Sequence, residues 1–386
     1  MNSPTDSMLR ALTRQQPAMV KMLRQLVECE SPSTDKTAVD GLGRMMAMML
    51  AERGAAVRVI PSRITGNHLR AEFRFTKKKA RQILLLGHID TVWELGTLAR
   101  MPFSVRRGRA YGPGAFDMKA GIVIAIYALE ALRHFGIPLK KNVVLLLNAD
   151  EEIGSPSSRS VTEQEARQSD CVLVVEPPHG PSGALKTARK GVGEFVLTVR
   201  GRAAHAGIEP EKGASAIIEI ARQLLYLENV AKSSGGLTLS AGSIRGGTRS
   251  NVIPAEAVAH LDVRILRNRD QRKIEKQLRS LRPVDPRTTL VVTGGFNRPA
   301  MERTRQGAAL FERARRLARP LGIDLKETAV GGGSDGNFTA ALGVPTLDGL
   351  GAVGDGAHAA HEHVVIRELP RRAALLAHLI ASLGAE

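Results

Sequence analysis

Apolar residues in the first half of the chain follow two different spacings. Apolar positions three and four residues apart predict helices over residues 7–28, 37–53 and 122–135. Between these helices stand short runs with little polar alternation, which is the pattern of strands covered on both faces. Such runs predict strands at residues 55–60, 67–75, 83–86, 142–147 and 171–175. Strands that alternate with helices predict an α/β domain with a mainly parallel or mixed sheet covered by helices.

The pattern changes near Gly191 and returns near residue 302. Inside this interval, β-branched runs predict strands at 195–199, 237–244, 257–265 and 289–292, and helical spacing predicts helices at 214–230 and 272–281. This order predicts an α+β sandwich with an antiparallel sheet. A helix at 306–317 and a strand at 344–347 then resume the first pattern. We therefore predict a discontinuous domain, residues 1–190 and 302–386, that is interrupted by an inserted domain, residues 191–301.

The composition agrees with two soluble domains. A chain of 386 residues is longer than one hydrophobic core usually supports. Hydrophobic residues make up 43% and charged residues 24%, which excludes a disordered chain. The two cysteines, Cys29 and Cys171, lie in apolar or helical surroundings, so we expect free buried thiols.

The charge of +17 is the one unusual bulk property. It fits either an anion-binding surface or an enzyme rich in arginine. The basic residues are dispersed, and the densest runs, 77–81 and 313–319, are not interleaved with aromatic residues. Aromatic residues amount to only 3%, which argues against a surface that stacks bases, so we expect no nucleic acid partner. The apolar runs are too short to cross a membrane and the first 20 residues lack a signal core, so we expect no membrane partner and a cytoplasmic location.

Polar residues gather where the predicted strands end. His88 and Asp90 follow the strand at 83–86, the acids Asp150, Glu151 and Glu152 follow the strand at 142–147, and Glu176 follows the strand at 171–175. Open α/β sheets carry their sites at the carboxyl ends of strands. Consecutive acids repel one another unless a cation is present, so a metal explains them better than an exposed turn does.

Two loops add further candidates. Asp117 lies in a glycine-rich segment before a helix, where the alternative is a helix cap, and His358 is followed four residues later by Glu362. Mixed imidazole and carboxylate ligands suit zinc, with cobalt or manganese as alternatives. We interpret His361 and His363 as surface residues.

The ordered motifs resemble a known family. Gly-His-Ile-Asp-Thr-Val at 87–92, Gly-Pro-Gly-Ala-Phe-Asp-Met-Lys-Ala-Gly at 112–121, Asp-Glu-Glu-Ile-Gly-Ser at 150–155 and Glu-Pro-Pro at 176–178 are similar to those of the dizinc exopeptidases of the twentieth metallopeptidase family. The glutamate carboxypeptidase group (carboxypeptidase G) is the closest in likeness, and acetylornithine deacetylases, desuccinylases and aminoacylases are relatives. The resemblance covers nearly the whole chain.

The resemblance implies a two-zinc site and a role for each residue. His88 and Glu176 would hold one zinc, Glu152 and His358 the other, and Asp117 would bridge them. Glu151 matches the general base, and Asp90 matches the carboxylate that orients the histidine His88.

The inserted domain also resembles that of the family, where it serves as a dimerisation or lid domain. His205 matches a histidine that stabilises the oxyanion in the neighbouring subunit, so the resemblance implies a homodimer. Asn251 and Arg264 match substrate contacts, the arginine as a carboxylate-binding group, and Gly333 lies in a loop that faces the substrate. One departure concerns glutamate specificity: Ala184 stands where the closest relatives have a lysine, and the nearby cations are Lys186, Arg189 and Lys190.

The resemblance therefore implies a hydrolase that cleaves amide bonds of peptides or N-acyl amino acids and releases a C-terminal amino acid. A deacylase of the acetylornithine deacetylase or aminoacylase type is the alternative. A protein that binds metal without turnover is disfavoured, because it has no need of a base such as Glu151 beside the metals.

Overall fold

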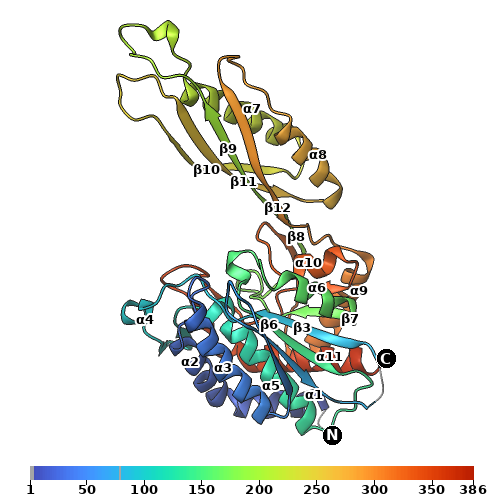
Figure 1. The fold of residues 1–386 in the computed structure, drawn as a ribbon. Coiled ribbons are helices and arrows are strands. Elements are labelled where there is room, and N and C mark those ends of the chain that lie inside the picture. The colour runs from blue at the N-terminus through green and yellow to red at the C-terminus, as the bar shows by residue number, and fades with distance from the viewer. Residues whose placement is uncertain (1–3, 78–79) are drawn as a thin grey trace. The chain divides into compact units, whose positions relative to one another are not determined.

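The computed structural model describes residues 4–77 and 80–386, so part of the basic run at 77–81 lies outside the described residues. The chain divides into two compact units (Figure 1). The first consists of residues 1–188, 303–330 and 334–386, and the second of residues 189–302 and 331–333. The glycine-rich segment 331–333 thus packs with the second unit, whereas the sequence pattern assigned it to the first.

The first unit is built on a six-stranded mixed sheet. Its order is β1-β2-β6-β3-β7-β14, in which β6, β3, β7 and β14 run parallel and β1 and β2 pair antiparallel at one edge. The strands are β1 (Ala56–Ile60), β2 (His68–Phe73), β3 (Gln82–His88), β6 (Val143–Asn148), β7 (Ser169–Val174) and β14 (Thr346–Leu347). The predicted mixed sheet is confirmed.

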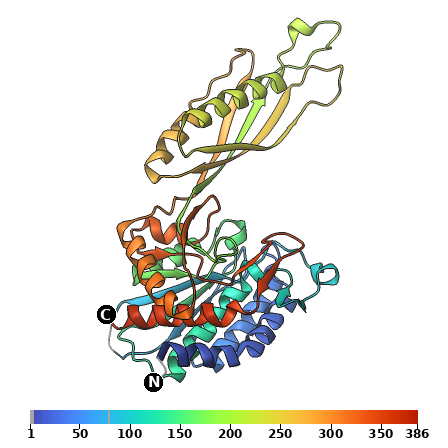
Figure 2. The same cartoon turned by 180° about the vertical axis from the view of Figure 1, so that it is seen from behind.

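Both faces of this sheet are covered, which is why its strands read as continuous apolar runs. Alternate residues of β3 point to opposite sides: Ile83 and Leu85 join the main core, and Leu84 and Leu86 join a second cluster. The main core is formed with α1 (Pro4–Arg14), α2 (Gln16–Glu28), α3 (Lys36–Glu52), α5 (Ala120–His134), α9 (Arg305–Ala318) and α11 (Glu368–Gly384). On the other face lies α6 (Arg159–Arg167), with α10 (Gly336–Ala341) beside it. From behind, α11 lies alongside α1 (Figure 2).

Several elements differ from the prediction. The helix predicted over 7–28 is two helices. The first, α1, ends at Arg14, and α2 begins at Gln16 with Pro17 in its first turn, a position that favours the start of a helix. The prediction also missed the helix α11, although its apolar spacing was present, and several short helices and strands. These are α4 (Thr97–Arg100), α6, α10, β4 (Ser104–Arg106), β5 (Arg109–Tyr111), β8 (Leu185–Arg189), β13 (Glu327–Val330), β15 (Gly354–Asp355) and β16 (His363–Val365).

The second unit is a four-stranded antiparallel sheet with two helices. The order is β10-β11-β9-β12, with strands β9 (Gly191–Arg200), β10 (Thr238–Gly246), β11 (Glu256–Ile265) and β12 (Thr289–Arg298). Alternate residues of β9 and β11 are buried against α7 (Ala216–Ser233) and α8 (Asn268–Arg279). The edge strand β10 is exposed along most of its length. The predicted antiparallel α+β sandwich is confirmed.

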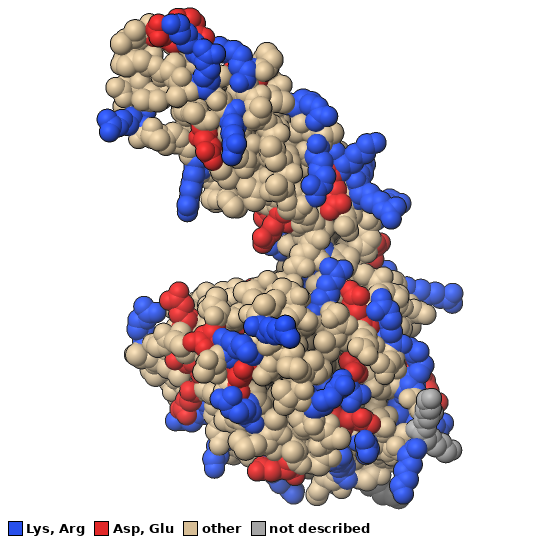
Figure 3. Space-filling view, in the orientation of Figure 1, with Lys and Arg blue, Asp and Glu red and all other residues tan. Residues whose placement is uncertain are grey.

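Three further observations bear on the bulk properties. Lys and Arg are spread over the visible face of both units with acidic residues between them (Figure 3). Cys29 and Cys171 are free thiols, as predicted, but only Cys171 is buried; Cys29 is partly exposed, so its predicted burial was wrong. Burial raises the pKa of Cys171 to about 12. Among the described residues, none of the helices combines the length and the apolar character that a membrane span requires.

Candidate metal centre

Three neighbouring strands bring candidate residues to one edge of the sheet. His88 is the last residue of β3, Glu151 and Glu152 begin a short 3-10 turn that starts three positions after the end of β6 at Asn148, and Glu176 follows β7. These strands are adjacent and parallel, in the order β6-β3-β7, so their carboxyl ends meet. The structure therefore places together the residues that the strand ends predicted.

Two loops complete the cluster. Asp117 lies in the tight turn Ala115–Lys119, before α5, and His358 lies in a turn after β15. One oxygen of Asp117, Oδ1, is 3.3 Å from His88 Nε2, and the other, Oδ2, is 3.5 Å from His358 Nε2. Each histidine also faces a glutamate: His88 Nε2 is 3.4 Å from Glu176 Oε1, and His358 Nε2 is 3.3 Å from Glu152 Oε2.

These separations suit two metal ions. Two ligand atoms at about 2.1 Å from a tetrahedral zinc lie about 3.4 Å apart. Each histidine and its glutamate show this spacing, and Asp117 offers one oxygen to each pair. The ligand atoms of His88, Asp117 and Glu152 lie within 4.8 Å of one another, as do those of His88, Glu151 and Glu176.

Unpaired buried atoms indicate that a cation belongs here. Among the described residues, buried side-chain atoms without a hydrogen-bond partner include His88 Nε2, Asp117 Oδ1 and Glu152 Oε1. Leaving such atoms unsatisfied costs about 1–3 kcal/mol each, more when they are charged. All three face the same small volume, so the residues present fit a bound metal.

The tautomer of His88 fits the same role. Its Nδ1 lies 2.9 Å from the carbonyl oxygen of Asp90, which can only accept a hydrogen bond, so Nδ1 carries the proton. The lone pair of Nε2 then points at Asp117 and Glu176, as a metal ligand requires.

The electrostatics of the cluster attract positive charge. The hydrogen bonds that the His358 ring donates to the carboxylates of Asp117 and Glu152 raise the pKa of His358 to about 10. Burial and the neighbouring charge of Asp117 raise the pKa of Glu152. A group of carboxylates that holds a proton this tightly on an imidazole also favours a divalent cation.

Asp90 has a wider role than the one expected. Its carboxylate lies 3.5 Å from His88 Nδ1, farther than its own carbonyl oxygen. The two carboxylate oxygens accept the backbone N–H groups of Glu151 and Glu152 at 3.1 Å, and Ser33 donates to one of them at 2.6 Å. Asp90 thus links the His88 strand to the turn that carries both glutamates.

The residues after His358 correct one prediction and reveal a missed one. His363 is buried and stacks on Tyr111 with ring centroids 5.1 Å apart, so its assignment to the surface was wrong, whereas His361 is exposed. Glu362 does not face the metal cluster. It is fully buried and accepts hydrogen bonds from Trp93 and from the loop that carries Asp117. In the sequence, the only feature that singled out Glu362 was its position four residues after His358.

In the second unit, His205 and Asn251 lie side by side. The N–H of Ala206 donates to the carbonyl of Asn251 at 3.0 Å, and both residues are exposed. The N–H of Gly207 donates to His205 Nδ1 at 3.2 Å. The neutral ring therefore carries its proton on Nε2, where it can donate a hydrogen bond to a ligand.

Arg264 and Gly333 have partners within the second unit. The Nε and Nη2 groups of Arg264 donate to the carboxylate of Asp262 at 2.8 and 2.9 Å, and its Nη1 donates to the carbonyl of Gly331 at 2.8 Å. Arg189 donates to the carbonyls of Gly332 and Gly333 and so supports the glycine-rich segment. Arg189 and Lys190, which donates to Thr238, are thus already engaged in the protein.

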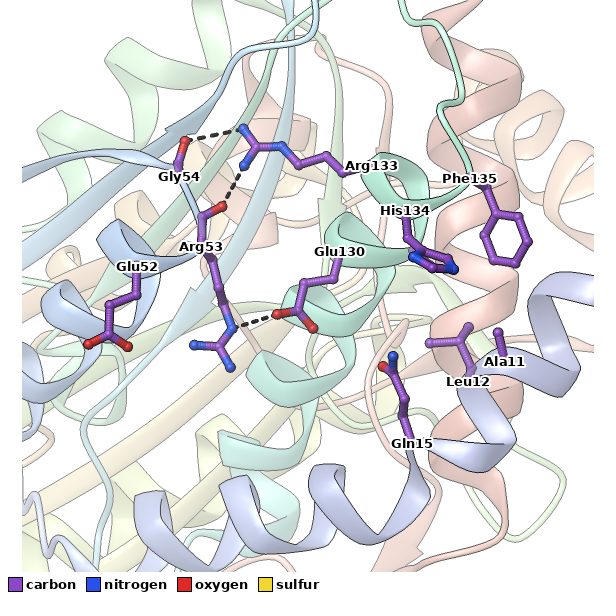
Figure 4. Close-up of a pocket in the computed structure, with 11 residues that line it drawn as sticks. Ala11, Leu12, Gln15, Glu52, Arg53, Gly54, Glu130, Arg133, His134 and Phe135 are labelled. Carbon is purple, nitrogen blue, oxygen red and sulfur yellow. Dashed lines mark hydrogen bonds and ion pairs between the residues drawn. The ribbon is translucent and has the colours of Figure 1, made fainter.

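A surface pocket lies at the other end of α5 from this cluster (Figure 4). The helix has 15 residues, so its ends are about 22 Å apart. Both arginines of the pocket pair within the protein: Arg53 with Glu130 at 2.8 Å, and Arg133 with the carbonyl of Gly54 at 3.2 Å. The pocket offers none of the predicted site residues.

The fold and the paired ligand sets define a metal-dependent hydrolase of the metallopeptidase and amidohydrolase class. Residues 84–382 match the model of Peptidase family M20/M25/M40, and the chain belongs to this family. It is 31% identical to carboxypeptidase G2 of Pseudomonas sp. strain RS-16 over 386 residues, which cover 98% of this chain and 92% of that protein.

Two further similarities agree with this assignment. The chain is 30% identical to acetylornithine deacetylase of Erwinia tasmaniensis over 274 residues, which cover 65% of this chain and 68% of that protein. The crystal structure of aminopeptidase PepT from Bacillus cereus ATCC 10987 superposes with a TM-score of 0.79 at 23% identity, covering 95% of this chain and 98% of that one. At this identity the structural likeness supports the fold alone.

Proposed function

We propose that the chain is a two-zinc carboxypeptidase that releases the C-terminal amino acid from peptides or N-acyl amino acids. The observation that carries the proposal is Asp117, whose two oxygens face two different histidines, each paired with its own glutamate. The similarity to carboxypeptidase G2 over nearly the whole chain supports the assignment of the cleaved bond as the one that joins the C-terminal amino acid. Cobalt or manganese would also suit these ligands.

Each residue of the cluster has a task in this reaction. His88 and Glu176 would hold one ion, Glu152 and His358 would hold the other, and Asp117 would offer one carboxylate oxygen to each. Metal ions bound by these residues would supply the positive charge that lowers the pKa of a water molecule. Glu151 would accept a proton from the water molecule as the water oxygen adds to the carbonyl carbon, and it would deliver that proton to the leaving nitrogen as the C–N bond breaks, which yields a carboxylate and an amine. Asp90 fixes the turn on which Glu151 stands.

A panel of substrates tests the proposal. The zinc-loaded protein should release the C-terminal amino acid from dipeptides and N-acyl amino acids, a chelator should abolish the activity, and added zinc should restore it. Amino acid analysis and metal analysis of the same samples measure both effects. Activity that survives removal of all metal would contradict the proposal. Preferential release of acetate from N-acetyl amino acids would support the deacylase alternative, which the similarity to acetylornithine deacetylase favours.

The second unit supplies the remaining groups in our proposal. Asn251 contacts the substrate, Arg264 receives its terminal carboxylate in exchange for Asp262, and the backbone at Gly333 faces it. His205 donates from Nε2 to the oxyanion of a neighbouring subunit. A homodimer joined through α7 and β10 is supported by the exposed edge of β10 and by apolar side chains on α7 that are at least half exposed, namely Ile218, Leu225 and Tyr226. The free cysteines support a cytoplasmic location.

Mixing two inactive variants tests the shared site. A Glu151→Gln chain and a His205→Ala chain should each be inactive alone, but a heterodimer of the two contains one composite site with both residues intact. After random exchange, about a quarter of all sites should be active. The measurement is activity of the co-expressed variants against each variant alone, with light scattering to establish the dimer. A monomer without recovered activity would contradict the dimer and leave the metal assignment unaffected.

A further inference from the structure

We propose that Glu362 is a positioning residue that clamps the Asp117 loop, residues 112–119, to the His358 turn, residues 356–362. By this clamp it sets the affinity of the metal ion held by Asp117, Glu152 and His358. The inference rests on the proposed two-metal site, and it concerns a residue that does not itself face the metals.

The carboxylate of Glu362 is completely buried and has four N–H donors. Oε1 accepts the backbone N–H groups of Phe116 at 2.8 Å and Asp117 at 3.0 Å. Oε2 accepts the backbone N–H of Gly114 at 2.9 Å and the indole N–H of Trp93 at 2.8 Å. Three of these four donors belong to the Asp117 loop, so the carboxylate fixes the backbone of the proposed bridging ligand directly.

The backbone of Glu362 connects the same side chain to His358. Its N–H donates to the carbonyl of Ala359 at 2.9 Å and so closes the turn that begins at His358. Its own carbonyl accepts the N–H of Gly112 at 3.3 Å, which is a further bond to the Asp117 loop. Glu362 is therefore the residue through which the two loop-borne ligands keep their mutual distance of 3.5 Å.

The two metal sites differ in how much they need this clamp. His88 pairs with Asn148 in the ladder between β3 and β6, and Glu176 follows two residues after β7, where its carbonyl accepts the N–H of Gly351 at 2.9 Å. His358 is half exposed and stands on a turn, with a left-handed backbone at φ 61° that residues other than glycine rarely adopt. Loss of the clamp should therefore weaken the His358 site more than the His88 site.

Only a carboxylate satisfies this arrangement. It offers acceptor positions for all four donors, whereas glutamine keeps one oxygen and turns an amide NH₂ toward two N–H groups. Glu362→Gln nearly preserves the shape of the side chain but breaks two of the four bonds. Removal of such an outer partner of a metal ligand typically costs about 10–100-fold in metal affinity.

Equilibrium dialysis of the metal-free protein against buffered zinc, followed by metal analysis, tests the clamp. The unmodified chain should bind two equivalents. Glu362→Gln should weaken both equivalents, since Asp117 serves both ions, but the loss should be larger at the His358 site, where the affinity should fall by about 10–100-fold. Trp93→Phe is the matched control, since it removes one donor but leaves all three bonds to the Asp117 loop, and its second equivalent should bind nearly as in the unmodified chain.

Three results would overturn the inference or its basis. Glu362→Gln that binds both equivalents with unchanged affinity, or that loses both equally, overturns the clamp. An unmodified chain that binds no zinc overturns the proposed function itself. The melting temperature of each metal-free variant shows whether it is folded. If Glu362→Gln is not, Glu362→Asp, which keeps the charge but shortens the side chain by one methylene, must show the same larger loss at the His358 site.

Discussion

Replacing Asp117 with alanine is expected to empty both metal sites at once. Each ion would keep only a histidine and a glutamate, His88 with Glu176 and His358 with Glu152, which is two ligands short of a tetrahedral site. The two cations would also lose the anionic group that stands between them. Metal content should fall from two ions per chain to almost none, and the hydrolysis rate should fall by at least about 10³-fold, since the acidified water is lost with the metals.

The matched control is an aspartate at the other end of a site-bearing strand. Asp170 lies in β7, which leads to Glu176, and its carboxylate pairs with Arg81 at 2.7 Å and Lys141 at 2.8 Å. Asp170→Ala should keep both ions and normal turnover, because the change is remote from the cluster. Elemental analysis and activity of the two variants decide the matter. An Asp117→Ala protein that still binds two ions would show that the residue does not bridge them.

Replacing Glu151 with glutamine is expected to separate metal binding from catalysis. Glutamine keeps the shape of the side chain but cannot accept a proton, so the rate should fall by about 10²–10⁴-fold, the usual contribution of a general base. Both metal ions should remain, and KM should change little, because substrate contacts are untouched. Metal analysis and steady-state kinetics on the same preparation measure these effects.

The Glu152→Gln variant is the matched comparison, because it distinguishes a metal ligand from a general base. Glu152 is the adjacent residue on the same turn, but it faces His358 and is the proposed ligand. Its replacement should lower metal content, whereas replacement of Glu151 should not. The ligand atoms of Glu151, His88 and Glu176 lie within 4.8 Å of one another, so a ligand role is the real alternative. Loss of one ion from the Glu151→Gln protein would establish that alternative and leave the general base to be found elsewhere.

The chain's membership of the peptidase family and the geometry of the cluster are independent observations, and both support a metal-dependent hydrolase. The family match covers residues 84–382, which include all the proposed ligands, but it does not by itself say which atoms face which. The distances between Asp117, His88 and His358 supply that information. Ala184 stands where the resemblance implies a lysine, and Arg189, a nearby cation in the sequence, donates to the carbonyl groups of Gly332 and Gly333.

The sequence alone determined the features that depend on local pattern. The apolar runs that form β3, β6 and β7 are continuous because both faces of the sheet are covered. These strands could therefore be predicted from the sequence, together with the polar residues that follow each of them. The polar residues His88, Glu152 and Glu176 followed from the rule that parallel strands end at one edge. The motifs carried the resemblance, and with it the proposed roles of Asp117 and Glu151.

The tertiary structure alone decided the features that depend on contacts between distant segments. The short strands β4, β5, β15 and β16 have too few residues to show a period, and they exist because they pair with one another. The burial of His363 against Tyr111 follows from that pairing. Glu362 lies 245 positions from Asp117 in the chain, and a hydrogen bond across that separation leaves no local pattern. A buried carboxylate and an exposed one have the same letter in the sequence, and only the fold distinguishes them.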